Sequence, residues 1–331
     1  MARKLAISLN WSDTFNLKDL IERAKIADAA GIDSIWVAET WGFDALTMLT
    51  AFAEHTSRIQ LATAIVNIYS RTPAALAQHF GTLDKLSNGR MIIGLGTSSA
   101  QVVEHFHGVK FNPPLTRLKE ALEIINLLLS GNSLNYNGKL FKMSRGFKLR
   151  FEPHRKHIPI WIASLNSKSV EFTARHTDGW LPSMIPLGGL ARATTEFRAL
   201  AKEAGRSPND VEVKSPGHVT ITNSPERARA SHAGTVAFYA ARMGTFYSEQ
   251  LARHGFGGDM AKIKEAWSSS GAKAGIAAAS EKLLTELGYI GGLEGAIDRL
   301  KAQDEAGIDV HTVEIEASSP AEFEKITARL L

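Results

Sequence analysis

The sequence contains no cysteine in its 331 residues, which excludes disulfide bonds, thiolate metal sites and a cysteine nucleophile. No apolar run approaches the ~18 residues of a membrane-spanning helix, and none follows the N-terminal Met1-Ala2-Arg3-Lys4. Although the formal net charge is +4, no run of Lys or Arg is longer than two residues. We therefore expect a cytoplasmic protein with no membrane or nucleic-acid partner, whose mildly basic surface attracts a small polyanionic molecule.

Motifs of metal-dependent and serine hydrolases are also missing. The sequence has neither a His-Glu-x-x-His motif nor a Gly-x-Ser-x-Gly nucleophile elbow. His105 and His107 form a His-x-His pair, but they lie well beyond Gly96, where the nearest predicted strand is ending. His154 and His157 offer a second pair without ligand spacing. We interpret all four as loop histidines and predict no metal site.

What the chain does contain is a repeated cycle of helix, glycine stop and apolar strand. Ala30-Gly31-Ile32-Asp33 precedes a predicted strand at 34–38, and Ala306-Gly307-Ile308-Asp309 precedes another at 310–315. Further strands are predicted at 4–10, 61–66, 91–99, 158–163 and 180–181. Buried apolar strands that alternate with helices indicate a parallel sheet covered by helices. The chain length and the number of cycles favour an α/β fold, a (β/α)8 TIM barrel, as a single domain over residues 1–331.

Two long segments interrupt this cycle. The first, at about 98–157, follows the fourth predicted strand and carries a helical pattern and a hairpin signal at Asn137-Gly138, typical of a two-residue turn. The second, at about 224–287, follows the seventh strand and is largely helical in pattern. Long insertions after barrel strands lie over the active-site mouth, so we expect both to form a substrate lid.

Small polar residues mark two of the predicted strand ends. Gly94-Leu95-Gly96-Thr97-Ser98-Ser99 begins like a dinucleotide fingerprint, but Ser99 replaces the third glycine, which disfavours a Rossmann fold. These residues either pack closely or hold a phosphate or a ring edge with Thr97 and Ser98, and we favour the second interpretation. Ser164-Leu165-Asn166-Ser167 suits a phosphate at a helix N-terminus, although from the residues alone an ordinary N-cap by Asn166 or Ser167 is the better interpretation.

Acidic residues mark two other strand ends. Glu39 and Thr40 close the strand at 34–38, where a carboxylate can act in catalysis or orient a cofactor. A solvated charge is an equally good interpretation of Glu39. Glu314 and Glu316 end the strand at 310–315 in a similar way, and either of them paired with Glu39 would suit glycoside chemistry.

A set of short motifs, taken in order, resembles a known family. The motifs are Ile35-Trp36-Val37-Ala38-Glu39, Ala62-Thr63-Ala64-Ile65, Arg71-Thr72-Pro73-Ala74, Leu83-Asp84-Lys85-Leu86-Ser87-Asn88-Gly89-Arg90, Gly94-Leu95-Gly96-Thr97, Gln101-Val102-Val103-Glu104, Phe106-His107-Gly108, Pro159-Ile160-Trp161-Ile162-Ala163, Asp178-Gly179-Trp180-Leu181-Pro182 and Met243-Gly244. Their order and spacing over nearly the whole chain resemble the luciferase-like superfamily. Within it, the chain is most similar to the oxidoreductases that use coenzyme F420, including methylenetetrahydromethanopterin reductase-like proteins.

This resemblance implies an oxidoreductase that moves a hydride between the deazaflavin coenzyme F420 and a small organic substrate, in a barrel that usually forms a homodimer. It implies a non-proline cis peptide at Ala64–Ile65 against the cofactor ring. The site residues that it implies are Glu39 and Thr40 for catalysis, and Thr63, Ala64, Ile65, Gly96, Thr97, Ser98, Ser164, Leu165, Asn166 and Ser167 for cofactor binding.

Two positions depart from the family pattern, and other functions stay open. Thr40 stands where some deazaflavin dehydrogenases have a catalytic His, and Leu165-Asn166 replaces glycines of the phosphate loop. We expect Arg242 or Arg253 in the second insertion to meet the acidic tail of the deazaflavin. The alternatives are an FMN-dependent luciferase-like monooxygenase, a non-catalytic flavin-binding barrel protein, a phosphate-binding isomerase or aldolase, and a metal-dependent hydrolase.

Overall fold

The computed structural model describes residues 3–9 and 16–331, so that Asn10 of the first predicted strand lies outside the described residues. The chain divides into two compact units, which are described separately. One unit is the continuous segment Leu9–Ala163, and the other combines Met1–Ser8 with Ser164–Leu331. We call them the central-segment unit and the terminal-segment unit.

The central-segment unit is built on a parallel sheet of four main strands, in the order β2, β3, β5, β8. The strands are β2 (Ser34–Val37), β3 (Gln60–Thr63), β5 (Met91–Gly96) and β8 (Ile160–Ala163), and the short β4 (Val66–Asn67) also pairs with β5. Val37 pairs with Thr63, and Gly96 pairs with Ala163. Because the strands are parallel, these pairings bring their carboxyl ends to one edge of the sheet.

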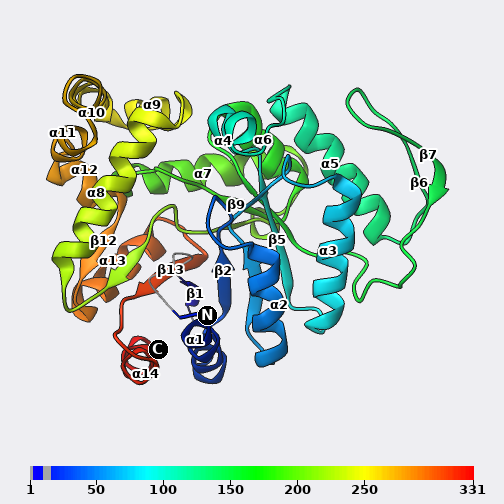
Figure 1. The fold of residues 1–331 in the computed structure, drawn as a ribbon, viewed down its shortest axis with the longest axis horizontal. Coiled ribbons are helices and arrows are strands. Elements are labelled where there is room, and N and C mark those ends of the chain that lie inside the picture. The colour runs from blue at the N-terminus through cyan, green and yellow to red at the C-terminus, as the bar shows by residue number, and fades with distance from the viewer. Residues whose placement is uncertain (1–2, 10–15) are drawn as a thin grey trace. The chain divides into compact units, whose positions relative to one another are not determined.

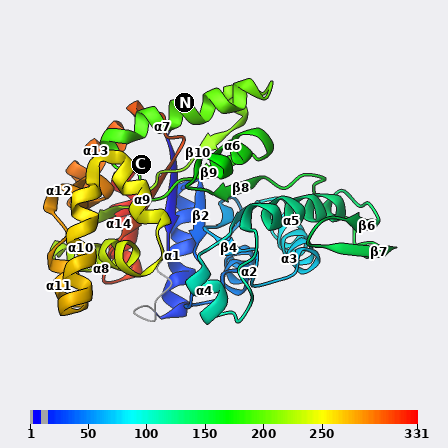
Figure 2. The same cartoon turned by 90° about the horizontal axis from the view of Figure 1, so that it is seen from above.

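Helices pack along this sheet and extend beyond it (Figures 1 and 2). They are α1 (Leu17–Ala30), α2 (Ala45–His55), α3 (Pro73–Leu86), α4 (Ala100–His105) and α5 (Pro114–Leu129). Helix α2 contacts β3, and α3 contacts both β5 and α5. Beyond α5 the chain forms an antiparallel hairpin of β6 (Leu134–Asn137) and β7 (Lys142–Phe147), which projects from the unit in both views.

Local sequence signals set most helix ends in this unit. The Asn16 side chain accepts a hydrogen bond from the Lys18 amide at the start of α1, and Thr72 caps α3 with Pro73 in its first turn. Asn88 and Gly89 follow α3 with φ values of 56° and 80°, a left-handed backbone that ends the helix as predicted. The hairpin prediction is only partly right. Asn137 pairs with Lys142, so the connecting loop has four residues, not the two that Asn137-Gly138 indicates.

The terminal-segment unit also contains a parallel sheet. Its strands are β1 (Lys4–Ser8), β9 (Gly179–Leu181), β10 (Glu212–Val213), β11 (Val219–Ile221), β12 (Tyr289–Gly291) and β13 (Val310–Ile315). Strand β13 pairs with β1 and with β11, β11 pairs with β12, and β10 pairs with β9. A bridge between Lys214 and Val310 joins the end of β10 to β13. The parallel α/β organisation expected from the repeated cycle is thus present in both units.

Two groups of helices accompany this second sheet. Elements near the sheet are α6 (Ser167–His176), α7 (Leu187–Glu203), the 3-10 turn η1 (Pro208–Asp210), α13 (Leu293–Glu305) and α14 (Pro320–Leu330). The segment between β11 and β12 is helical, as its pattern predicts: α8 (Pro225–Arg242), α9 (Phe246–Leu251), the π-helical turn η2 (Ala252–Phe256), α10 (Gly257–Ser270), α11 (Ala272–Ala277) and α12 (Glu281–Leu287). A separate apolar cluster from α8, α10 and α12, including Val236, Ile263 and Leu283, holds this segment together.

Candidate functional site

The carboxyl ends of β3 and β5 are locked together without space for a side chain at Gly94. The Thr63 hydroxyl donates to the Gly94 carbonyl oxygen (2.7 Å) and accepts from the Gly94 amide (2.9 Å). A Cβ atom built on Gly94 would lie 1.7 Å from the Thr63 carbonyl oxygen. The Thr63 hydroxyl therefore holds the two strand ends together.

The peptide bond between Ala64 and Ile65 is cis, as the family resemblance implied. The Ala64 amide donates to the Val37 carbonyl oxygen (2.8 Å), and the Glu39 amide donates to the Ile65 carbonyl oxygen (3.3 Å). These bonds hold the segment after β3 against the end of β2. The Ile65 side chain is partly exposed and lies over Gly96, where a Cβ atom would come within 3.1 Å of its Cδ1. Ile65 therefore stands at the sheet edge with an open apolar surface.

Glu39 is part of an ion-pair network. Both of its carboxylate oxygens accept from Arg71, at 2.6 and 3.0 Å, and one also accepts from the Ala45 amide at the start of α2 (3.2 Å). Arg71 also contacts Asp44, the N-cap residue of α2. The Glu39 side chain is only 10% exposed, so the interpretation of Glu39 as a solvated charge is wrong. Arg71 was missed as a functional candidate because its partner lies 32 positions earlier in the chain.

Two hydroxyl groups at the same sheet edge are buried without partners. Within the described ranges, neither Thr40 Oγ1, just after β2, nor Ser99 Oγ, just after β5, has a hydrogen-bond partner. Ser98 between the strand and α4 has a φ of 57°, and the contact of Thr97 Oγ1 with the Ser98 carbonyl oxygen is long at 3.5 Å. Buried polar groups are nearly always satisfied, so unpaired hydroxyls here indicate that an absent polar group completes this edge.

The predicted phosphate loop at 164–167 belongs to the terminal-segment unit. The Ser164 hydroxyl is 3.0 Å from Thr173 Oγ1, and the Trp180 indole donates to the Ser164 carbonyl oxygen (3.0 Å). Asn166 caps α6 by accepting from the Ser169 amide (3.0 Å), which is the interpretation that the residues alone favoured. Ser167 is exposed at the first position of α6.

A guanidinium group from the second insertion reaches the same loop. Arg253 Nη2 donates to the Leu165 carbonyl oxygen (3.2 Å) and to Gln250 (2.7 Å). Arg242, the other predicted tail-binding residue, is exposed at the end of α8. Several aromatic residues of this segment pack together, as in the perpendicular pair of Tyr239 and Tyr247 with ring centroids 4.7 Å apart. Of the two predicted arginines, Arg253 is therefore the one that the structure shows in contact with the loop at 164–167.

The histidines considered as metal ligands have other surroundings. His107 Nε2 lies 3.0 Å from the Asn67 side-chain nitrogen, and His154 packs against Gly89. Over residues 3–9 and 16–331, no group of three or more His, Asp or Glu side chains is arranged to hold a metal ion. Over the same ranges, no helix is both long and apolar enough to cross a bilayer.

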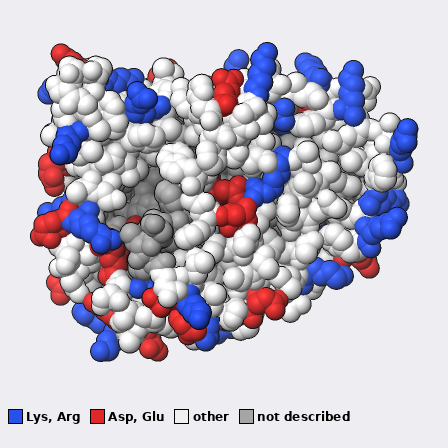
Figure 3. Space-filling model, viewed as in Figure 1, with Lys and Arg blue, Asp and Glu red and all other residues white. Residues whose placement is uncertain are grey.

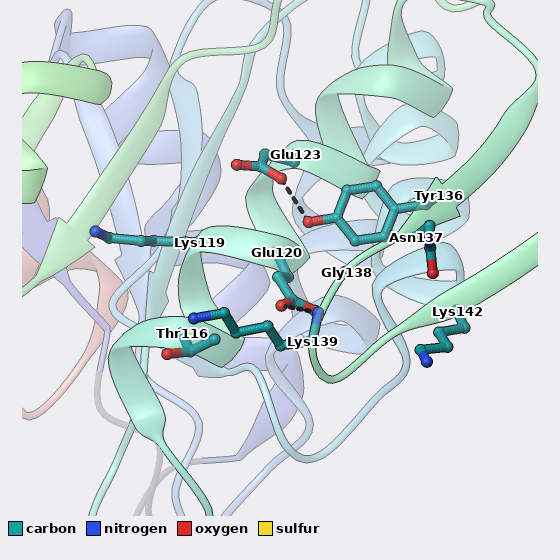
Figure 4. Close-up of a pocket in the computed structure, with 9 residues that line it drawn as sticks. All are labelled: Thr116, Lys119, Glu120, Glu123, Tyr136, Asn137, Gly138, Lys139 and Lys142. Carbon is teal, nitrogen blue, oxygen red and sulfur yellow. Dashed lines mark hydrogen bonds between the residues drawn. The ribbon is translucent and has the colours of Figure 1, made fainter.

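A surface pocket of about 590 Å³ lies between α5 and the hairpin, and none of the predicted site residues lines it (Figure 4). Tyr136 points towards Glu123 and donates to it (2.5 Å), while Glu120 accepts from the amides of the hairpin loop. The other lining residues include Lys119, Lys139 and Lys142. Lys and Arg side chains also mark this side of the molecule in Figure 3. The carboxylates of this pocket are thus engaged in fixing the hairpin to α5.

The sequence of the chain is similar to those of known proteins. A family model described as "Luciferase-like monooxygenase" matches residues 5–310. A Mycobacterium tuberculosis protein described as "Putative coenzyme F420-dependent oxidoreductase" is 32% identical over 264 residues, 76% of this chain and 75% of that protein. A 5,10-methylenetetrahydromethanopterin reductase of Archaeoglobus fulgidus is 28% identical over 302 residues, 89% of this chain and 88% of the relative.

A solved structure extends the likeness to the whole fold. The coenzyme F420-dependent tetrahydromethanopterin reductase from Methanopyrus kandleri superposes with a TM-score of 0.82 at 22% identity, covering 99% of this chain and 97% of that one. The motifs, the cis peptide bond after β3 and the match to the family model agree. The chain belongs to the luciferase-like monooxygenase family.

Proposed function

We propose that this protein is an oxidoreductase that transfers a hydride between coenzyme F420 and a small organic substrate. The choice of coenzyme rests on relatives whose descriptions name F420. The observation in this chain that carries the proposal is the pair of buried hydroxyls of Thr40 and Ser99 at one sheet edge, which have no hydrogen-bond partner among the described residues. A tricyclic cofactor with a polar ring edge and hydroxylated side chain would supply the groups that these two atoms lack.

The residues at this sheet edge have different roles in the proposed site. When bound, the deazaflavin supplies the hydride chemistry, and the protein supplies position and electrostatics. Thr40 would hydrogen-bond the cofactor, while Glu39 orients this edge through Arg71. Thr63 and Ala64 fix the backbone on which Ile65 presents its apolar surface. The loop Gly96-Thr97-Ser98 offers backbone amides and hydroxyls to a polar group.

The second set of predicted contacts involves the loop at 164–167 and Arg253. Asn166 and Ser164 hold the loop in place, whereas the exposed Ser167 is accessible to an anion. Arg253 adds a positive charge at this loop. Guanidinium groups bind carboxylates and phosphates in a bidentate way, so we propose Arg253 as a contact of the anionic part of the coenzyme.

Titration of the purified protein with F420 and, separately, with FMN tests the proposal. We expect F420 to bind more tightly than FMN, with the absorbance of the deazaflavin perturbed. Thr40→Val should weaken F420 binding about threefold to tenfold, the loss of one hydrogen bond, while Thr40→Ser keeps the hydroxyl and most of the affinity. Tight FMN binding with oxygen-dependent turnover would instead support a flavin monooxygenase. Cofactor binding without turnover on any electron donor would indicate a non-catalytic binding protein.

The remaining family expectations are part of the same proposal. We propose that the two units belong to one (β/α)8 barrel domain over residues 1–331, with the segments at 98–157 and 224–287 as insertions after strands 4 and 7 that form a substrate lid. We further propose a cytoplasmic homodimer. A high-resolution crystal structure with F420 would test the barrel and the lid directly.

A further inference from the structure

The hairpin of β6 and β7 carries positive charge without any acidic residue. Over positions 134–150, which we call the basic hairpin, the chain has no Asp or Glu. Its basic side chains are all exposed, and they are Lys139, Lys142, Arg145, Lys148 and Arg150. The Lys139 ammonium interacts with the Glu120 carboxylate of α5. The other four form no ion pair with any residue in the described ranges, so the basic hairpin presents a patch of uncompensated positive charge.

One large apolar side chain stands among these cations. Phe147, the last residue of β7, is 72% exposed, against 58% for Phe106. Its neighbours at 145 and 148 are the exposed Arg145 and Lys148. The two-stranded sheet has no covered edge, and an apolar side chain on an open edge strand favours aggregation unless a partner covers it. The exposure of Phe147 therefore indicates a contact that this chain alone does not make.

A bulge in β7 lies next to Phe147. Between its pairings at Met143 and Phe147, β7 has three residues, whereas β6 has only Asn135. Two of the three, Arg145 and Gly146, have left-handed φ values of 78° and 64°, which is an uncommon conformation for arginine. Bulges re-aim side chains and, like exposed lysines, prevent an edge strand from pairing with a strand of another chain. The basic hairpin is therefore unsuited to strand pairing with a second protein.

The basic hairpin is also held in a defined position. Glu120 accepts a hydrogen bond from the Lys139 amide in the hairpin loop (2.7 Å), and Tyr136 donates to Glu123 (2.5 Å). The hairpin projects from the central-segment unit in Figures 1 and 2, and Lys and Arg side chains mark the same side of the molecule in Figure 3. Its cations and Phe147 are thus presented to the surroundings without a prior ordering step.

We propose that the basic hairpin docks the protein on an anionic membrane surface, with Phe147 inserted among the lipid headgroups and the cations against the lipid phosphates and carboxylates. Clusters of four to eight Lys or Arg bind the negatively charged cytoplasmic leaflet, and an aromatic side chain adds apolar contact at the headgroup level. This inference does not depend on the proposed function. It changes the expectation, drawn from the lack of a long apolar run, that the protein has no membrane partner, because a peripheral contact needs no such run.

The charge and the bulge disfavour a second copy of this chain as the occupant. In a symmetric dimer the same patch meets itself, which would bring the cations of two basic hairpins together. A contact through strand pairing is opposed by the bulge at Arg145 and Gly146. An anionic lipid surface satisfies both the charge and the exposed ring.

The aromatic residues of the hairpin disfavour nucleic acid. Single-stranded nucleic acid binds along a groove in which successive bases stack on several aromatic side chains. In the basic hairpin Tyr136 is bonded to Glu123, and Phe141 packs against the Arg117 guanidinium, 5.0 Å from the ring centroid. Phe147 alone has no ring partner among the described residues. One ring beside several cations suits a planar lipid surface better than a row of bases.

Co-sedimentation with lipid vesicles tests the proposal. One set of vesicles is phosphatidylcholine alone, and the other is an equal mixture of phosphatidylcholine and phosphatidylserine, each at low and at high salt. The charge variant combines Lys142→Gln, Lys148→Gln and Arg150→Gln. Its matched control removes the same charge from exposed positions elsewhere and combines Lys262→Gln, Lys273→Gln and Lys325→Gln.

We expect the wild type to bind the mixed vesicles but not phosphatidylcholine alone, and to dissociate at high salt because exposed charges are screened. Each cation at an anionic surface contributes about fivefold to binding, so the charge variant should bind about a hundredfold more weakly. The control should change binding by less than about threefold, since its charges lie outside the hairpin. Thermal unfolding should be the same for all of these proteins, because the substituted side chains are exposed.

Two substitutions at Phe147 test insertion separately from charge. Phe147→Ser should weaken binding to the mixed vesicles about tenfold, the effect of losing one apolar side chain from an interface. Phe147→Trp should restore it, and the added tryptophan fluorescence should shift to the blue only with the mixed vesicles. Phe106→Ser, which removes another exposed phenylalanine, should leave vesicle binding unchanged.

Other outcomes would overturn the inference. Equal binding to both kinds of vesicle, or equal losses in the charge variant and its control, would mean that the basic hairpin is not the docking surface. The absence of a blue shift in Phe147→Trp would exclude insertion. Binding of a single-stranded DNA oligonucleotide without vesicle binding would assign the patch to nucleic acid. Self-association that Phe147→Ser abolishes, again without vesicle binding, would assign it to a second copy of the chain.

Discussion

At the scale of single residues, Gly94 is the position where the sheet edge tolerates least change. A Cβ atom there would lie 1.7 Å from the Thr63 carbonyl oxygen, a backbone atom that cannot turn aside. We expect Gly94→Ala to separate the ends of β3 and β5 and to cost about 3 kcal/mol or more of unfolding free energy, as overpacking against fixed atoms does. Thermal and denaturant unfolding measure the loss.

Gly258 supplies a matched control for this substitution. It lies in the first turn of α10, and a Cβ atom there would meet no other atom within 4 Å. Gly258→Ala should leave stability unchanged or raise it by up to about 1 kcal/mol, because alanine restricts the unfolded chain and favours helix. Equal stability of the two variants would contradict the close approach of the Gly94 backbone to the Thr63 carbonyl oxygen.

The pair of Glu39 and Arg71 makes a second prediction at this scale. Their bidentate contact is mostly shielded from water, with 10% and 18% of the side chains exposed. We expect Glu39→Gln and Arg71→Gln each to destabilise the protein, and a double-mutant cycle to show a coupling of about 2 kcal/mol. Urea unfolding of the four proteins provides the measurement.

Asp44→Asn is the control for this cycle. It removes the second acidic partner of Arg71 but keeps a side chain that caps α2 equally well. Its loss should be smaller than that of Glu39→Gln. A coupling near zero between Glu39 and Arg71 would mean that Glu39 is free for another role.

At the scale of elements, the hairpin of β6 and β7 depends on one carboxylate in α5. Glu120 is buried and accepts from the amides of Lys139, Leu140 and Phe141, at 2.7, 3.0 and 2.9 Å. Although burial opposes it, these bonds lower the pKa of Glu120 below its ordinary value of 4.5. A carboxylate of this kind stabilises the fold above the unfolded pKa, and the stabilisation is lost as pH falls through the folded pKa.

We therefore expect Glu120→Gln to cost about 1–3 kcal/mol at neutral pH, because an amide cannot accept all three bonds and places its own N–H groups against donors. Hydrogen exchange at 139–141 should speed up. The difference in stability between the wild type and the variant should shrink in acid. Glu123→Gln, which changes only the contact with Tyr136, should leave exchange in the loop unaltered.

The same elements show which helix ends and loops can be predicted from the sequence alone. The ends of α1 and α3 were predictable because the capping residues Asn16, Thr72 and Gly89 act on amides within a few positions. The length of the hairpin loop was not predictable, because the loop amides donate three hydrogen bonds to Glu120, which lies in another element. Helix α4 was also missed, since six residues are too few to show a helical period.

Within the candidate site, the resemblance correctly located the cis bond at Ala64–Ile65, but the contact of Glu39 with Arg71 arises only when segments far apart in the chain come together. The family motif includes Arg71 without indicating its partner. Likewise, the sequence shows Glu314 at a strand end but not the approach of Thr220, in β11, and of His218, just before that strand. Such contacts are set by strand register, which local patterns do not specify.

At the scale of the whole molecule, we expect two copies of the chain to associate. Large apolar side chains remain exposed, among them Phe106 at 58% and Trp41 at 49%, and a partner subunit would cover such surface. Sedimentation equilibrium should give a mass twice the 36.0 kDa of one chain. A monomer at micromolar concentration would contradict the expectation drawn from the family.

The pairing of β1 with β13 has a consequence for how the protein is made. Lys4 lies beside Val310, so β1 leaves the ribosome before its partner β13, which is encoded about 300 positions later. At about 5–20 residues per second, β1 waits on the order of 15–60 s for that partner. During this interval Leu5 and Ile7, which end up buried, have no β13 to pack beside. A chain whose translation stops before Val310 leaves this apolar strand without its β13 neighbour, an exposed edge that chaperones and proteases can recognise.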